Sequence, residues 1–451
     1  MIKITTIILA AGQGTRMRSN TPKVLHLLAG QPLILYSLQS SVGIGTEMPV
    51  VVIGHGSEQV RQVIGDKARF VLQEPQLGTG HAVRAAESLL AGKTDLVLVI
   101  SADMPLMSGD TLRRMASIQQ ANPGPVTMLT ILSDDSHGFG RVIRALDGSV
   151  REIVEEAQAT PEQLAIRELN VGAYCFKASW LWDALKRIPL SPKGEYYLTD
   201  TVGLAVADGL AVQALALEDA GEALGINTRV HLAEAETILR QRINSKHMLA
   251  GVTLVDPPST YIQAGVTIGK DTVVWPNTYL RGNTTIGEGC TIGPNTIVED
   301  THIGNDCTIL ASVLEGAEVE DHVGMGPFCH LRKGAHLAED VHMGNFGEVK
   351  DSYLGPGTKM GHFSYIGNAH IGADVNIGAG TITCNFDGVN KNPTEIGDHA
   401  FIGSDTMLVA PVSIGEGART GAGSVVTHDV PPLDVVVGVP ARHLKKLEKS
   451  E

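Results

Sequence analysis

The chain has few cysteines and no long apolar run. Its five cysteines are scattered and form no CxxC pair, which argues against a zinc knuckle, a redox motif and a disulfide framework. No stretch is long and apolar enough to span a membrane, and the N-terminal apolar run is too short for a signal peptide. We therefore expect a cytoplasmic protein without membrane insertion.

Positive charge and aromatic residues are also scarce. The chain has 35 Lys and Arg against 49 Asp and Glu, a net charge of −14, which argues against a broad nucleic-acid surface. Anionic small-molecule substrates must then be bound by local cations. Aromatic residues make up only 4% of the chain, whereas glycine is abundant, with 51 residues. Such a composition indicates many tight turns around cores of small and branched aliphatic side chains.

The 451 residues are too many for one core, and two segments differ in their periodicity. Up to about residue 224, apolar runs alternate with helical segments, which indicates an α/β domain with a mainly parallel sheet. We expect strands at 4–9, 50–53, 96–100 and 126–131 and helices at 79–90 and 110–120. Residues 229–248 predict one amphipathic linker helix. The expected domains are 1–226, the linker 227–250, and 251–451.

The second segment repeats every six residues. Aliphatic residues recur from Ile262 to Val298, from Val319 to Val349 and from Ile396 to Val426. A period of six fits no helix and predicts a parallel β-helix with a stacked internal ladder. Between Ile377 and Ile396 the repeat is interrupted by GAGTITCNFDGVNKNP, which predicts an extruded loop at 384–392. Loops inserted in solenoids commonly lie on a binding face.

The opening motif, LAAGQGTRMRSNTPK at 9–23, predicts a phosphate-binding site. It follows a buried strand, and Gly12 and Gly14 free the backbone to present N–H groups to an anion. Arg16 and Lys23 place two cations nearby. The spacing matches neither GxxxxGK[ST] nor GxGxxG. This combination is suited to an enzyme that acts on a nucleoside triphosphate.

The chain contains four further motifs: QEPQLGTGHA at 73–82, GFGR at 138–141, GEYYLTD at 194–200 and GHFSYIGNAHIGADVNIGAGTITCNFDG at 361–388. Together with the opening motif, they make the whole chain resemble one family, the bifunctional N-acetylglucosamine-1-phosphate uridyltransferase/glucosamine-1-phosphate N-acetyltransferases. The resemblance implies an α/β nucleotidyltransferase (Rossmann-like) domain followed by a left-handed β-helix. The implied function is acetyl transfer from acetyl-CoA to glucosamine 1-phosphate, then uridyl transfer from UTP with release of pyrophosphate.

The resemblance also implies the residues of the first site. Arg16 and Lys23 would face the phosphates as catalytic cations, and Asp103 and Asn227 would hold Mg²⁺. The expected UTP and sugar contacts are Leu9, Ala10, Ala11, Gly12, Lys23, Gln73, Gly78, Thr79, Gly140, Glu155, Asn170 and Asn227, with Tyr196 and Thr199 nearby.

In the second site, His362 would be the general base, with Glu348 beside it. We expect it at an exposed corner of a coil, two residues after the ladder residue Met360. The backbone N–H of Ala379 would meet the thioester oxygen. The expected glucosamine phosphate contacts are Arg332, Lys350, Tyr365 and Asn376, and the expected acetyl-CoA contacts are Ala379, Asn385, Phe386, Ser404 and Ala422. The resemblance further implies a homotrimer formed through the β-helix.

Two other interpretations remain open from the sequence. One is a single-activity nucleotidyltransferase whose β-helix is structural or regulatory. The other is a non-enzymatic solenoid platform with an inactive catalytic domain.

Overall fold

The computed structural model describes residues 2–45, 47–136 and 138–446. The chain divides into two compact units, Met1–Leu239 and Arg240–Glu451. The division falls inside helix α9 (Arg229–Leu249), the segment in which the sequence predicts a helix. Among the described residues, none of the helices combines the length and apolar character needed to cross a bilayer.

The first unit is built on a nine-stranded sheet. Its strands are β1 (Ile4–Ala10), β4 (Val50–Ile53), β5 (Arg69–Leu72), β6 (Leu96–Ser101), β7 (Val126–Leu132), β8 (Arg141–Arg144), β9 (Val150–Val154), β10 (Glu168–Lys177) and β11 (Val212–Ala216). The main path runs β11-β7-β10-β6-β1-β4-β5, and β8 and β9 form a hairpin beside β10. Only β10 on this path is antiparallel to its neighbours. The sheet is therefore mainly parallel, as expected.

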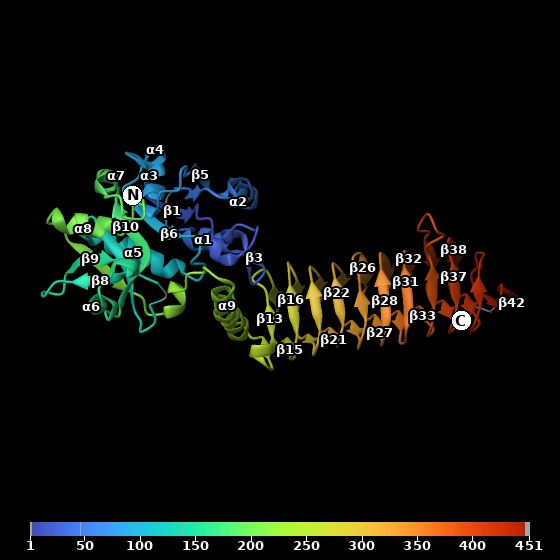
Figure 1. The fold of residues 1–451 in the computed structure, drawn as a ribbon. Helices are drawn as coiled ribbons and strands as arrows, with labels where there is room; N and C mark the ends of the chain where they lie inside the picture. The colour runs from blue at the N-terminus through green and yellow to red at the C-terminus, as the bar shows by residue number, and fades with distance from the viewer. Residues whose placement is uncertain (1, 46, 137, 447–451) are drawn as a thin grey trace. The chain divides into compact units, whose positions relative to one another are not determined.

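Helices cover both faces of this sheet (Figure 1). They are α1 (Leu33–Ser41), α2 (Ser57–Ile64), α3 (Thr79–Ala85), α4 (Glu87–Leu90), α5 (Gly109–Ala121), α6 (Pro161–Leu164), α7 (Ala178–Arg187) and α8 (Asp200–Ala207). The core that contains Ile8 includes residues of α1, α2 and α5, whereas Ile7 packs with residues of α3, α4, α7 and α8. Because both faces of β1 are buried, its sequence does not alternate between apolar and polar residues, and even Thr5 and Thr6 are buried.

The four strands expected in this unit are confirmed, since each lies within β1, β4, β6 or β7. The helix expected over 79–90 is interrupted at Ala86. There the N–H of Ala86 bonds to the carbonyl of Val83 at 3.0 Å, a tighter turn than the α-helical pattern, and α4 begins at the next residue. The helix expected at 110–120 corresponds to α5.

The second unit is a parallel β-helix with three sheet faces. Face 1 has twelve strands from β12 (Thr253–Leu254) to β42 (Arg442–Lys446), face 2 has ten from β13 (Tyr261–Ile262) to β40 (Val425–Val426), and face 3 has nine from β14 (Thr267–Ile268) to β38 (Val412–Ile414). Figure 1 shows these short strands stacked in successive coils. The predicted ladder residues lie inside and form one continuous core.

The ladder departs from strict six-residue spacing at several five-residue steps and at the insertion. The five-residue steps run from Val298 to Ile303, from Ile309 through Leu314 to Val319, from Val349 to Leu354 and from Ile366 to Ile371, so these coils are shorter. Before the insertion Thr383, 1% exposed, pairs in register with Leu408. The sequence obscures these coils because five-residue steps and a buried threonine break the aliphatic pattern. The insertion itself spans 385–393, between β34 (Ile382–Cys384) and β35 (Thr394–Ile396).

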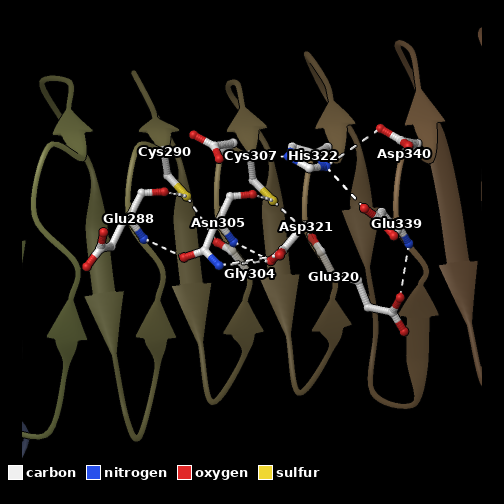
Figure 2. Close-up of polar contacts among 11 residues, drawn as sticks. Glu288, Cys290, Gly304, Asn305, Cys307, Glu320, Asp321, His322, Glu339 and Asp340 are labelled. Carbon is white, nitrogen blue, oxygen red and sulfur yellow. Dashed lines mark hydrogen bonds and ion pairs between the residues drawn. The ribbon is translucent and has the colours of Figure 1, made fainter.

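Polar side chains link the turns from face 3 to face 1 (Figure 2). Asn305 Oδ1 accepts from the N–H of Glu288 at 2.9 Å, and Asp321 Oδ1 accepts from the N–H of Asn305 at 2.6 Å. One coil further, His322 Nδ1 lies 3.4 Å from Glu339 Oε1 and 3.9 Å from Asp340 Oδ1. These contacts pair polar groups in the turn of one coil with polar groups of the next coil, which stabilises the stacking.

Candidate active sites

The first candidate site surrounds the loop that follows β1. Gly14 has a left-handed φ of 64°, and a Cβ there would lie 2.5 Å from Lys23 Cβ, so glycine lets Lys23 pack against the loop. Gln76 Nε2 donates to the carbonyl of Ala11 at 2.7 Å, which holds the loop from the other side. This position beyond the carboxyl end of β1 is where α/β sheets bind ligands.

A cavity of about 920 Å³ opens at this loop. The residues predicted from the opening motif, from 73–82 and from later in the unit come together in its wall: Leu9, Ala10, Ala11, Gly12, Lys23, Gln73, Gly78, Thr79, Asp103, Gly140, Glu155, Asn170 and Asn227. Arg16 is not among the lining residues, but its Nη2 donates to Asn227 Oδ1 at 3.0 Å.

Two expected metal ligands lie on either side of one ammonium group. Lys23 Nζ is 2.5 Å from Asp103 Oδ2 and 3.1 Å from Asn227 Oδ1. The hydroxyl of Ser101 donates to the other carboxylate oxygen of Asp103 at 2.6 Å. A carboxylate and an amide oxygen that already share one cation form a donor set that fits Mg²⁺.

Glu155 and Asn170 are polar residues of the cavity wall, and Glu155 has an acidic neighbour in Asp200. Thr199 Oγ1 donates to Glu155 Oε1 at 2.8 Å, and Tyr174 Oη donates to Asn170 Oδ1 at 3.0 Å. Asp200 follows Thr199 at the start of α8. Burial, together with the charge of Glu155, raises the pKa of Asp200 to about 6.

Tyr196 lies near the cavity but does not line it. Thr199 lines the cavity, and the lining tyrosine of GEYYLTD is Tyr197. The backbone of Tyr196 bonds to Leu77 and Gly80, and its ring lies 5.5 Å from the Arg84 guanidinium. Adjacent residues of an extended segment face opposite ways, so the motif alone does not decide which tyrosine faces the ligand.

The second candidate site begins with a row of residues along one edge of the β-helix. Met360, Ile377, Ile402 and Thr420 occupy equivalent ladder positions on successive coils of face 1. Two residues after each comes the turn to face 2. These four turn positions hold His362, Ala379, Ser404 and Ala422. His362 is exposed there, as expected.

Cations gather on face 2, at the ends of its strands next to the turn to face 3. Arg332 and Lys350 follow equivalent ladder positions on neighbouring coils. Lys391, from the 385–393 insertion, lies beside Lys350 and lowers the pKa of that lysine, and Arg332 adds to the effect. Three neighbouring cations form a site suited to a phosphate group.

Tyr365 and Asn385 converge next to these cations. A Cβ placed on Gly367 would collide with Tyr365 Oη and lie 2.9 Å from Asn385 Nδ2, so glycine makes room for both groups. Asn385 Nδ2 donates to Asn368 Oδ1 at 2.7 Å, and Asn385 is 8% exposed.

Glu348 pairs with a different residue from the one expected. Its Oε1 accepts from Arg332 Nη1 at 3.0 Å. Among the residues that the structure describes, His362 makes no side-chain hydrogen bond or ion pair. The expected contact between Glu348 and His362 is therefore not present in the single chain. Asn376 lies on face 1, and Phe386 is exposed in the insertion, where it bridges to Lys391.

Comparison with protein families matches both units. Residues 6–171 match the MobA-like NTP transferase domain. Residues 265–300 and 393–428 match the bacterial transferase hexapeptide (six repeats). The second unit is thus the left-handed parallel β-helix of hexapeptide repeats, and the fold class predicted from the sequence is confirmed.

Whole-length relatives decide the family. "Bifunctional protein GlmU" of Heliobacterium modesticaldum is 48% identical over 432 residues, which cover 96% of this chain and 94% of that protein. The proteins of the same name from Streptococcus agalactiae and Trichlorobacter lovleyi are 46% and 47% identical, each over 96% of this chain and 94% and 95% of theirs. The chain belongs to the GlmU family.

Membership of the GlmU family confirms the expected function. The protein is a bifunctional enzyme of UDP-N-acetylglucosamine synthesis, with glucosamine-1-phosphate acetyltransferase and uridyltransferase activities. Its substrates include a nucleotide and acetyl-CoA. The single-activity and non-enzymatic interpretations are set aside, because relatives named as bifunctional proteins match over 96% of this chain.

Several residues near the sites escaped sequence reasoning. Gln76 lies inside the motif at 73–82, and Lys391 lies just after the motif at 361–388. These motifs could therefore have suggested both residues. Arg141 of GFGR is 4% exposed and donates to the carbonyl of Phe139 at 2.5 Å and to Glu156 Oε2 at 3.1 Å. A buried arginine cannot be told from an exposed one by its spacing.

Proposed function

We propose that the cavity of the first unit is the uridyltransferase site. What carries the proposal is the convergence of thirteen residues, predicted from motifs spread over 9–227, in the wall of one cavity. Gln73, Gly78 and Thr79 hold the uridine with residues 9–12. Gly140, Glu155 and Asn170 hold the N-acetylhexosamine.

Uridyl transfer needs positioning and charge neutralisation more than covalent help from the protein. The phosphate of N-acetylglucosamine 1-phosphate attacks the α-phosphorus of UTP, and pyrophosphate leaves. Arg16 and Lys23 neutralise phosphate oxygens, and the N–H groups of the glycine loop orient them. Asp103 and Asn227 hold Mg²⁺, which neutralises phosphate charge when bound.

We further propose that the row at the edge of faces 1 and 2 is the acetyltransferase site. His362 accepts a proton from the protonated amine of glucosamine 1-phosphate. The free amine then attacks the thioester carbonyl, and the C–S bond breaks to release coenzyme A as its thiol. Ala379 occupies the position equivalent to His362 on the next coil. Its backbone N–H donates to the oxyanion that forms from the thioester carbonyl. Ser404 and Ala422 continue the row and hold the coenzyme A chain, with Asn385 and Phe386 beside it.

The glucosamine phosphate is held on the outer side of face 2. Arg332 and Lys350 bind its phosphate group and Tyr365 binds its hydroxyls, while Asn376 contributes from face 1. Glu348 keeps Arg332 oriented through their 3.0 Å contact. Because these groups are only partly buried in one chain, a neighbouring chain completes the site.

We propose a homotrimer formed through the β-helix. Outward residues of face 2 form two partly buried apolar patches, Ile297 with Val313 and Ile382 with Met407 and Val425. The polar residues His330, Glu348 and Tyr365 lie between the two patches. Val313→Glu and Met407→Glu should reduce the trimer and acetyl transfer together, whereas Thr291→Glu on face 1 should not. Light scattering measures the assembly. A monomer with full acetyltransferase activity would contradict the proposal.

We propose that the enzyme works in the cytoplasm. All five cysteines are unpaired, and four are buried, which suits a reducing compartment. Thiol titration of protein purified without reductant should find five free thiols in denaturant.

The two sites are tested by separating their activities. Asp103→Ala should abolish uridyl transfer and leave acetyl transfer unchanged. His362→Ala should do the reverse, with a rate loss of about 10²–10⁴-fold for a missing general base. Loss of both activities from either substitution, in a protein that keeps its unfolding transitions, would overturn the assignment.

A further inference from the structure

The side chain of Gln73 is buried but lines the cavity, being 5% exposed. It follows β5, and its backbone N–H bonds to the carbonyl of Ile53 at 2.8 Å. Its Nε2 lies 2.9 Å from the carbonyl oxygen of Gly78 and 3.2 Å from His81 Nδ1. A carbonyl oxygen only accepts, so the amide nitrogen, not the amide oxygen, must face Gly78.

His81 takes the second hydrogen of that amide. The ring is half-buried in the first turn of α3 and also bonds to the backbone of Pro75, which has no N–H and therefore accepts. A neutral imidazole donates at one nitrogen and accepts at the other, so Nδ1 is the acceptor that faces Gln73. Burial, with the nearby charge of Arg84, lowers the pKa of His81, which favours the neutral ring.

Both amide hydrogens of Gln73 are thus occupied by Gly78 and His81. Only Oε1 remains for a ligand, and it is an acceptor. Rotating the amide by half a turn would set Oε1 against the carbonyl oxygen of Gly78 and against the lone pair of Nδ1. Such opposed acceptors are unfavourable in a buried site, so the orientation is fixed.

We propose that His81 is a positioning residue that fixes the Gln73 amide, so that the cavity selects a pyrimidine with an N3–H donor over cytosine. Uracil and thymine carry a hydrogen on N3, whereas N3 of cytosine is an acceptor and would oppose Oε1. The inference rests on the proposed placement of uridine at Gln73. His81 does not line the cavity and acts only through Gln73.

The test compares UTP with CTP in the full-length enzyme, with N-acetylglucosamine 1-phosphate and Mg²⁺. His81→Phe keeps a ring but removes the acceptor, and it should lower the ratio of kcat/KM for UTP to that for CTP by about tenfold. His81→Asn places an amide oxygen near the former Nδ1 and should keep the ratio within about threefold of wild type. His55→Asn, at an exposed histidine outside the cavity wall, is the matched control and should change nothing.

The outcomes separate this inference from the placement of uridine. If Gln73→Leu leaves kcat/KM for UTP unchanged, the uridine is not held at Gln73, and the proposed function fails there. If Gln73→Leu impairs the use of UTP but His81→Phe keeps the wild-type ratio, only the role of His81 is overturned. Should His81→Phe lack the unfolding transition of the first unit, the same comparison is made with His81→Ala.

Discussion

Lys23 and Asp103 form an ion pair of 2.5 Å, and the same ammonium group reaches Asn227 at 3.1 Å. A lysine in the wall of the same cavity therefore neutralises Asp103 and donates to Asn227, the two groups proposed to hold Mg²⁺. The pair is mostly shielded from solvent, with exposed side-chain fractions of 13% and 20%. Such shielding strengthens charge effects relative to the surface.

Removal of this lysine should change metal binding and catalysis in opposite directions. In Lys23→Gln, a divalent cation no longer competes with a fixed positive charge, so Mn²⁺ should bind about tenfold more tightly in the absence of nucleotide. Uridyl transfer should fall by at least about 100-fold, because the phosphates lose a cation. Electron paramagnetic resonance measures the affinity for Mn²⁺, and pyrophosphate release measures the rate of uridyl transfer. Weaker Mn²⁺ binding in this variant would contradict the shared site.

Arg141 should hold the sugar end of the cavity in shape. It joins Phe139, in the cavity wall, to Glu156, next to the wall residue Glu155. Arg141→Met should raise KM for N-acetylglucosamine 1-phosphate about tenfold and leave acetyl transfer unchanged.

Arg144 provides the matched control for that variant. It lies on the same strand and pairs with Glu168 at 2.6 Å, outside the cavity wall. Arg144→Met should change the sugar phosphate KM by less than about twofold, as expected for a surface ion pair. Equal effects of the two substitutions would show that Arg141 acts only on general stability.

Asp200 should make the first unit less stable as pH rises. Its pKa is raised to about 6 from 3.8, so the folded state holds the proton more tightly than the unfolded chain. The stabilising effect of that proton is complete below the unfolded pKa and is lost as pH rises through the folded one. Asp200→Asn should therefore raise the free energy of unfolding at pH 8 by up to about 3 kcal/mol, and by about half as much at pH 5.

Asp208, at the other end of α8, supplies a contrast of opposite sign. Its hydrogen bonds to Arg187 and Trp180 lower its pKa to about 2. The charged carboxylate of Asp208 stabilises the folded state above its unfolded pKa, and this stabilisation is lost as pH falls through its folded pKa. Asp208→Asn should therefore destabilise the unit at neutral pH. Urea unfolding at several pH values measures both variants, and the same sign for both would refute the assignment.

Lys350 should act through the charge of its cluster. Lys350→Met should raise KM for glucosamine 1-phosphate, with a smaller change in kcat, because it removes a phosphate contact distant from the proposed base. Lys333→Met, at the exposed lysine beside Arg332, is the control and should leave KM unchanged. Steady-state acetyl transfer at two salt concentrations measures both. An equal loss in both variants would indicate general electrostatic attraction instead of a built site.

The sequence predicted the main frame of both sites, because they follow local rules. Buried strands, the glycine loop and the six-residue period each depend on nearby residues, and the row that contains His362 and Ala379 follows from that period. Contacts that depend on how the chain brings distant residues together could not be predicted from the sequence. Lys391 reaches Lys350 only through the course of the insertion, and Glu348 pairs with Arg332 because their coils are neighbours. The choice between Tyr196 and Tyr197 depends on backbone rotation, which the motif does not encode.

In the proposed acetyl-CoA site, the row from His362 to Ala422 is spaced by whole coils. Neighbouring coils are separated by one strand spacing of about 4.8 Å, so the three steps of the row span about 14 Å. The spacing is kept even though the chain between His362 and Ala422 contains a long insertion. Adding or deleting one coil would therefore change the length of the proposed site by one fixed step, which a point substitution cannot do.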